Sequence, residues 1–143
     1  MKKNISFLIL LIVFCRCSSV ISEYNTYAVP VPEHFKKEIL KKYESEKENY
    51  SLVYFTNNFK NDTITVSNIE GQIFKNDVST VDLIGLARVI RIDNNLATKI
   101  YNKKHKCSFK IPSNKYKFIY INKLSNSKIK YKILYSNVLH SFM

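Results

Sequence analysis

The amino-acid sequence predicts a mainly β protein, a β-sandwich of about seven strands preceded by one helix. From residue 51 onward, apolar and polar side chains alternate with a period of two, which is the pattern of strands that bury one face. The alternating segments are short and are separated by turn-forming residues, as in two-sheet sandwiches. The 143 residues, of which 45% are hydrophobic and 24% charged, fit one compact domain behind a targeting segment.

Residues 1–17 are expected to be a signal peptide. Two lysines near the start precede an apolar run, which is long enough for a signal peptide but shorter than the ~20 residues needed to span a bilayer. Cys15 and Cys17 follow at once, and two serines come directly after Cys17. This arrangement resembles a bacterial lipoprotein signal, in which a cysteine after the apolar run is acylated and becomes the new N-terminus.

We expect the lipid on Cys17, because the two serines follow it, and Cys15 is the alternative. The resemblance implies an exported protein, anchored in a membrane of the cell envelope and located in the periplasm or at the outer membrane. The alternatives to this anchor are a secretory signal that is cleaved without lipidation and an uncleaved N-terminal anchor. Removal of Cys15 and acylation of Cys17 would leave Cys107 as a lone cysteine, which we expect to be buried as a small apolar residue.

A helix is expected over residues 33–48. Phe35, Ile39 and Tyr43 recur at a spacing of four residues and give one apolar stripe. Three glutamates lie in the last five residues of this segment, where they oppose the helix dipole. Fraying is therefore expected at residues 44–48.

The helix is expected to lie between a tether and the sandwich. Residues 18–32 are expected to form the tether, because two prolines near its end disfavour regular pairing. Residues 51–137 are expected to form the β-sandwich domain. Its expected strands are residues 51–56, 63–66, 71–74, 85–92, 97–101, 107–111, 115–121 and 128–135.

Part of the sandwich follows a recognisable order of motifs. These are Gly71-Gln72-Ile73-Phe74, then Gly85-Leu86-Ala87-Arg88-Val89-Ile90-Arg91-Ile92, then Ala97-Thr98-Lys99-Ile100, then Phe109-Lys110-Ile111-Pro112 with Tyr116, and a closing strand at 128–135. Over about half of the chain this order resembles the carboxypeptidase-regulatory-like domain, a transthyretin-like β-sandwich of exported proteins. The Thr-Asp-x-x-Gly turn of that family is missing here. The resemblance implies an immunoglobulin- or transthyretin-like sandwich that serves as a non-catalytic accessory domain, and it implies no particular ligand.

Positive charge is concentrated in the C-terminal part of the chain. The formal net charge is +12, and residues 94–143 contain eleven lysines and no carboxylate. In three expected strands, lysines alternate with apolar side chains, so each strand would turn an apolar row inward and a lysine row outward. If these strands are neighbours, their lysines form one positively charged sheet face. The residues expected there are Lys106, Lys110, Lys115, Lys117, Lys128, Lys130 and Lys132.

This lysine face has two interpretations. It is either a solvated surface that discourages edge-to-edge pairing, or an anion-binding surface for lipid headgroups, acidic polysaccharide or another protein. Nucleic acid is not expected as a partner, because the protein is expected to be exported and no motif that reads RNA or DNA is present.

The sequence contains no motif of an enzyme site. Gly71 and Gly85 are the only glycines, which excludes glycine-rich phosphate loops and the Gly-x-Ser-x-Gly elbow. His34, His105 and His140 lack metal-ligand spacing, so no metal and no cofactor is expected, and the histidines should be exposed or partly packed. Acidic residues are few, and four of them are expected in turns, namely Asp62, Asp77, Asp82 and Asp93.

The sequence therefore predicts a non-catalytic exported envelope protein, a lipoprotein whose basic β-sandwich has a binding or structural role. The alternative is a secreted accessory domain that docks on a larger exported protein. A small hydrolase that uses scattered carboxylates is a third hypothesis, and it requires a pocket that brings two of them together.

Overall fold

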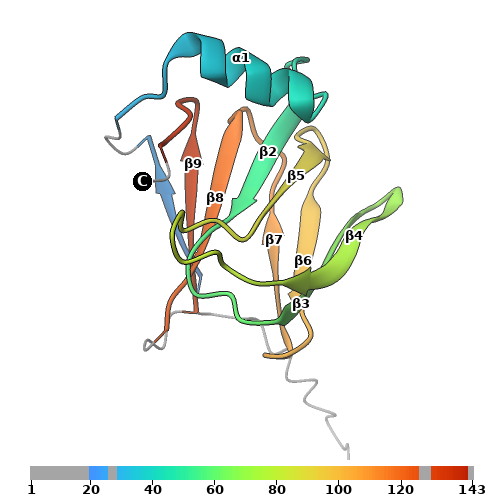
Figure 1. Ribbon diagram of the computed structural model, residues 1–143. Helices are drawn as coiled ribbons and strands as arrows, with labels where there is room; N and C mark the ends of the chain where they lie inside the picture. The colour runs from blue at the N-terminus through green and yellow to red at the C-terminus, as the bar shows by residue number, and fades with distance from the viewer. Residues whose placement is uncertain (1–19, 26–28, 126–129, 142–143) are drawn as a thin grey trace, which may run out of the picture.

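The computed structural model of the protein describes residues 20–25, 29–125 and 130–141 (Figure 1). The elements in chain order are β1 (Val20–Tyr24), α1 (Glu33–Lys42), β2 (Tyr50–Phe55), β3 (Asp62–Asn68), β4 (Gly71–Val78), β5 (Arg88–Asp93), β6 (Thr98–Asn102), β7 (Cys107–Ile111), β8 (Phe118–Lys123) and β9 (Tyr131–Ser136). The first sheet has the strand order β1-β9-β8-β2-β5, and the second has the order β4-β3-β6-β7. The predicted mainly β sandwich is thus confirmed for the described part of the chain.

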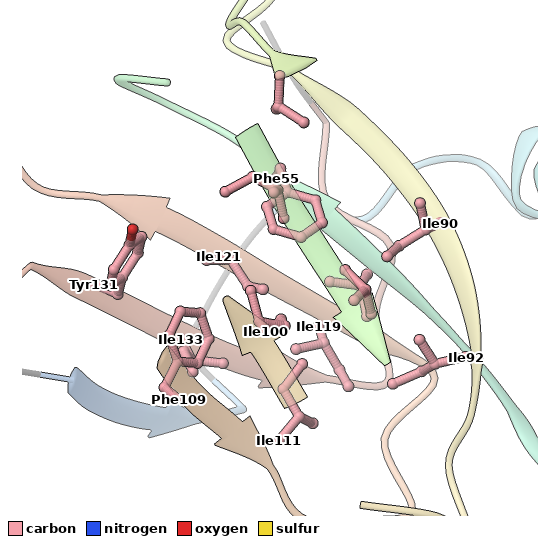
Figure 2. Close-up of a cluster of buried hydrophobic side chains, with 14 of the residues drawn as sticks. Phe55, Ile90, Ile92, Ile100, Phe109, Ile111, Ile119, Ile121, Tyr131 and Ile133 are labelled. Carbon is pink, nitrogen blue, oxygen red and sulfur yellow. The ribbon is translucent and has the colours of Figure 1, made fainter. Parts of the chain in front are cut away.

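The two sheets bury one continuous apolar core between them. Phe55, Ile90 and Ile121 point from the first sheet toward Ile100 and Ile111 of the second, and all five are buried (Figure 2). These are the alternate residues of their strands, so the core consists of the apolar rows that the period-two pattern predicted. Burial of aliphatic and aromatic side chains of this size is the main stabilising contribution in a domain of this length.

α1 packs on the outer side of the first sheet, opposite the second sheet (Figure 1). Ile39 and Leu40 of the helix pack against a second cluster that includes Leu52 of β2 and Phe118 of β8. Both faces of these central strands are therefore buried, and such strands have continuous apolar runs instead of alternation. The alternation predicted for residues 115–121 is wrong for this reason: β8 begins at Phe118, and its first four residues are all buried.

The first strand was not predicted. Residues 20–24, expected to be part of a tether, form β1, which pairs in parallel with β9 at the edge of the first sheet. Most of β1 is exposed, so its sequence has no buried apolar row to mark it. It is held by the strand ladder and by an ion pair of 2.9 Å between Oε1 of Glu23 and Nζ of Lys132.

The helix ends six residues earlier than predicted. α1 stops at Lys42, and Glu44 follows with a positive φ of 49°, a backbone conformation that cannot continue an α-helix. The backbone amide of Ser45 then donates to the carbonyl of Leu40 at 2.8 Å. The acidic segment that was expected to fray thus leaves the helix through a defined turn.

Strand β5 also begins later than predicted, at Arg88 instead of Gly85. Gly85 has a φ of 62°, and its amide donates to the carbonyl of Val81 at 2.9 Å, so it closes a turn before the strand. A Cβ atom at this position would lie 2.9 Å from Oδ1 of Asn57. The glycine is therefore required by both its backbone conformation and its surroundings.

Cys107 is buried at the start of β7, as expected, but it is disulfide-bonded. The expectation that it stands alone is thus wrong. The predicted signal peptide and its two cysteines, Cys15 and Cys17, lie outside the described residues. No described helix is both long and apolar enough to cross a membrane.

Candidate functional site

The lysines predicted to form one sheet face lie on different surfaces, so this prediction is wrong. β7 belongs to the second sheet, whereas β8 and β9 belong to the first. The chain crosses from one sheet to the other after Ile111, and sequence alternation does not reveal such a crossing. Lys110 consequently lies exposed on the second sheet, and Lys132 lies on the first sheet beside Glu23.

The remaining predicted lysines divide between the two ends of the sandwich. Lys115 and Lys117 precede β8, and Nζ of Lys117 donates to the carbonyl of Lys47 at 2.6 Å, next to the end of α1. Partial burial lowers the pKa of Lys117. Lys106 and Lys130 lie at the opposite end, where β8 finishes. Lys128 is outside the described residues.

That opposite end is rich in cations, and we call it the basic end. Its cations come from the β2–β3 connection, the β6–β7 turn, the last residue of β8 and the residue before β9, all at the bottom of Figure 1. They are Lys60, Lys103, Lys104, Lys106, Lys123 and Lys130, and the imidazole of His105 lies among them. All except Lys123 are exposed. These residues are distant in sequence and meet because both sheets finish at this end.

The β6–β7 turn brings three of these cations together with His105. The backbone amide of Lys103 donates to the carbonyl of Thr63 at 3.0 Å, which fixes the turn against β3. Oδ1 of Asn102 accepts a hydrogen bond from the amide of His105 at 3.2 Å. Lys106 then adopts a positive φ of 47°, which reverses the chain into β7. The run Lys103-Lys104-His105-Lys106 is thereby presented to solvent.

Asp62, the first residue of β3, lies fully buried beneath this cluster. Its Oδ2 lies 2.5 Å from Nζ of Lys123, and its Oδ1 lies 3.6 Å from both Nζ of Lys104 and Nε2 of His105. Oδ1 accepts no hydrogen bond within the described residues. The expectation that Asp62 lies in a turn is therefore wrong, because Asp62 begins β3 and its carboxylate is the internal counter-ion of the basic end.

A buried hydrogen bond lies next to Asp62 and joins the two sheets. Nδ2 of Asn102 on β6 donates to the hydroxyl of Tyr131 on β9 at 2.9 Å. Burial raises the pKa of Tyr131 to about 12, and the negative charge of Asp62 acts in the same direction. The hydroxyl therefore stays protonated at physiological pH and acts as a neutral hydrogen-bonding group.

His105 lies at the edge of the same cluster. Loss of hydration lowers its pKa, and the positive charges of Lys123, Lys104 and Lys130 act in the same direction, while Asp62 opposes them. Its imidazole is consequently neutral at physiological pH. The charge of the basic end then comes from six ammonium groups, partly offset by the carboxylate of Asp62.

A cavity of about 340 Å³ opens between these residues, and we call it the basic pocket. Its lining side chains are mainly cations and polar donors. They are Asn58, Lys60, His105, Lys123, Leu124, Ser125, Lys130 and Tyr131. The amide of Leu124 donates to the carbonyl of Lys130 at 2.9 Å and holds the two sides of the pocket together. Among the described residues, no carboxylate side chain lines the pocket, so it presents the chemistry that suits an anion.

A larger cavity of about 630 Å³ lies on the outer side of the first sheet. Its wall includes Tyr120 and His140, whose rings stack at 4.5 Å, and the segment that contains Leu83 and Ile84. Leu83 is 93% exposed, and Ile84 and Val81 are also exposed. This segment forms an apolar patch that a protein partner could cover.

Sequence reasoning missed most of the basic end. Lys106 and Lys130 were predicted as site residues, but Lys60, Lys123 and Asp62 were not. The run at residues 103–106 was the available local signal, since three lysines and a histidine in four consecutive residues do not follow the apolar–polar alternation of a half-buried strand. The pairing of Lys123 with Asp62 joins residues 61 positions apart, and no local pattern reveals it.

The other predicted titratable residues have structural positions. His34 is exposed and His140 partly packed, as expected. Asp93 accepts a hydrogen bond from the amide of Asn95 at 2.9 Å, which confirms its turn role. Asp77 lies in β4, not in a turn, and accepts a hydrogen bond from Thr63 at 2.6 Å. Within the described ranges, no three histidine, cysteine or acidic side chains are grouped so that they could hold a metal ion.

No protein-family model, curated protein or solved structure matches the chain. The candidate site therefore rests on its own geometry, which is a buried carboxylate, a surrounding group of cations and a donor-lined pocket.

Proposed function

We propose that the protein is an exported, non-catalytic envelope protein whose basic end rests on an anionic membrane surface and is held there by an N-terminal lipid. The observation that carries this proposal is the position of the first strand. Val20, which begins β1, pairs with Tyr131, and Tyr131 pairs with Lys123. The chain therefore enters the sandwich at its basic end.

The short distance from the leader to β1 strengthens the argument. Cys17 precedes Val20 by three residues, and three extended residues span at most about 11 Å. Cys15 precedes Val20 by five residues, which span at most about 18 Å, so a lipid on either leader cysteine would keep the basic end near the bilayer. A polybasic surface beside the lipid attachment site would add electrostatic attraction to the binding that the acyl chains supply.

Screening by salt explains why the position of the lysines at the basic end matters more for membrane binding than the net charge of the protein. At physiological salt the Debye length is about 8 Å, so only lysines close to the bilayer gain from its negative potential, each by about 1 kcal/mol. Lys115 and Lys117 lie at the far end of β8, whose six residues span about 20 Å. They are therefore too distant to contribute when the basic end faces the membrane.

The disulfide of Cys107 bears on which cysteine carries the lipid. The sequence has two other cysteines, Cys15 and Cys17, and a sulfur in a disulfide cannot also form a thioether with lipid. Cleavage before Cys17 would remove Cys15 and leave no thiol for Cys107. A lipid on Cys15 is compatible with a disulfide between Cys17 and Cys107, so we propose Cys15 as the lipid attachment site.

Vesicle binding tests the role of the basic end. A chain of residues 17–143 made without lipid contains every described element. It should co-sediment with vesicles that contain phosphatidylglycerol and not with pure phosphatidylcholine vesicles. Four substitutions in exposed residues of the basic end should abolish this binding: Lys60→Glu, Lys103→Glu, Lys106→Glu and Lys130→Glu. None of these four lysines is paired with Asp62, so the fold should persist.

A matched control separates this surface from general positive charge. The same charge change is made in four exposed lysines of other surfaces: Lys75→Glu, Lys99→Glu, Lys110→Glu and Lys115→Glu. This control variant should keep most of its vesicle binding. Equal loss in both variants, or no binding by the unmodified chain at low salt, would contradict the proposal.

The second candidate function is a secreted accessory domain that docks on a larger exported protein. The exposed apolar patch of Val81, Leu83 and Ile84 favours it, because contiguous exposed apolar residues commonly mark interaction sites. A stoichiometric partner from envelope extracts that is retained at high salt, and lost with Leu83→Glu, would support this function. The resemblance to the carboxypeptidase-regulatory-like domain is compatible with both non-catalytic functions.

A further inference from the structure

We propose that the basic pocket binds the phosphate group of a lipid headgroup. This inference rests on the proposed function but goes beyond it, because it assigns one binding site within a charged surface. A diffuse surface attracts any anionic membrane, whereas a pocket selects a chemical group. The ligand chemistry is a phosphate ester, and the membrane that the basic end faces is its proposed source.

The donors of the pocket converge on one volume. Lys60, Lys123 and Lys130 reach it from three separate segments, and Asn58 and Ser125 add neutral donors. Tyr131, whose hydroxyl accepts a hydrogen bond from Asn102 at 2.9 Å, completes the lining. A phosphate presents several acceptor oxygens and no obligatory donor, so it matches this lining.

Asp62 supports the pocket from below instead of lining it. Its carboxylate fixes Nζ of Lys123 at 2.5 Å, and only 14% of the Lys123 side chain is exposed. A lysine fixed in this way loses little side-chain freedom when an anion binds, and this lowers the cost of binding. Asp62 also prevents repulsion between Lys123 and Lys104, both of which approach the same carboxylate.

The pocket keeps a net positive charge after this neutralisation. Lys60 and Lys130 are exposed, and neither has a carboxylate within 4.0 Å in the described ranges. Nζ of Lys104 donates to the backbone carbonyl of Lys60 at 2.5 Å, which ties the β6–β7 turn to the β2–β3 connection beside the pocket. A carboxylate occupant would use fewer of these donors than a phosphate, so phosphate should bind more tightly.

Calorimetry with soluble ligands tests the inference. The probes are inorganic phosphate, glycerol phosphate and a short-chain phosphatidic acid below its micelle concentration, each titrated into residues 17–143. Saturable binding of the phosphatidic acid, tighter than that of inorganic phosphate, supports a lipid headgroup. Binding of inorganic phosphate with equal or higher affinity would overturn the lipid assignment and indicate a free phosphate ligand.

Paired variants test the location of the site. Lys60→Ala with Lys130→Ala removes two pocket cations and should weaken the binding of phosphatidic acid at least about tenfold, as expected for charge-assisted hydrogen bonds. Lys103→Ala with Lys106→Ala removes the same charge outside the pocket and should change this affinity less than about threefold. Equal effects in the two variants, or no saturable binding, would overturn the pocket as a site.

The imidazole of His105 supplies a second measurement at the pocket. A bound phosphate would add a negative charge beside His105, so its NMR-measured pKa should rise on binding. No change in the titration of His105 at saturating phosphatidic acid would contradict occupancy of the pocket. Vesicle binding that depends on the whole basic end but not on the pocket would leave the proposed function intact and remove only this inference.

Discussion

Nζ of Lys123 lies 2.5 Å from Oδ2 of Asp62, and this ion pair joins the last residue of β8 in the first sheet to the first residue of β3 in the second. The carboxylate is fully buried and the ammonium group nearly so. The same pair therefore has two roles: it connects the sheets at the end where the core stops, and it fixes a cation at the floor of the basic pocket.

Replacement of Asp62 by Asn should destabilise the protein by about 3 kcal/mol, because it leaves Lys123 partly buried without a counter-ion. The measurement is chemical unfolding followed by circular dichroism. Asp77→Asn is the matched control, since Asp77 lies on the neighbouring strand and is exposed. The control should cost less than about 0.5 kcal/mol. Similar losses of stability in the two variants would show that the buried ion pair of Asp62 and Lys123 contributes no more to stability than an exposed carboxylate does.

Replacement of Tyr131 by Phe should cost about 1 to 3 kcal/mol, because the buried amide of Asn102 then loses its hydrogen-bond acceptor. Tyr101→Phe is the control, because Tyr101 lies on the same strand as Asn102 but is 37% exposed. The loss of this exposed hydroxyl should leave the free energy of unfolding nearly unchanged. A Tyr131→Phe variant as stable as the wild type would indicate that this hydrogen bond does not hold the sheets together.

The sequence predicted β2 and β7 well, because alternation within a strand is a local property. The bounds of β7 were predicted without error, and those of β2 differ by one residue at each end. The division of these strands between two sheets was not predictable in this way. Alternation gives the buried face of a strand but not the sheet that it joins, so Lys110 and Lys132 were wrongly placed on one face.

The basic end was only partly predictable for a related reason. The excess of lysines after residue 94 was visible in the sequence, but the concentration of cations at one end of the sandwich depends on strand pairing between distant residues. Asp62 illustrates the difficulty, since its neighbours Asn61 and Thr63 are polar and nothing local marks it as buried. Its carboxylate is paired with Lys123 at the end of β8 and with Lys104 in the β6–β7 turn, both distant in sequence.

The stability of the fold should decrease as the pH falls below about 6.5, the ordinary pKa of histidine. Burial lowers the pKa of both His105 and His140 in the folded protein. The unfolded chain therefore binds more protons in this range, and protonation favours unfolding. The pKa of His140 is lowered by burial of its ring, which stacks on Tyr120. The pKa of His105 is lowered by burial and by the positive charges of Lys104, Lys123 and Lys130, whereas Asp62 raises it.

Urea unfolding at about pH 7.5 and about pH 5.5 measures this effect. The double variant His105→Gln with His140→Gln should show a smaller loss of stability between the two pH values than the wild type does. An identical loss in the variant would assign the acid sensitivity to other groups. NMR titration of the two imidazoles should independently give midpoints below the ordinary histidine value.

The cysteines provide a direct check on processing and anchoring. We expect the membrane-purified protein to begin with a lipid-modified Cys15 and to contain a disulfide between Cys17 and Cys107. Before reduction, no thiol should then react with iodoacetamide, and after reduction two should react. The variant Cys107→Ser should keep the lipid and expose one thiol without reduction. A lipid on Cys17 together with a reactive Cys107 would contradict the disulfide, and an unmodified N-terminus would contradict the anchor. In the second case the short link between leader and β1 would no longer hold the basic end at a membrane, and vesicle binding would depend on charge alone.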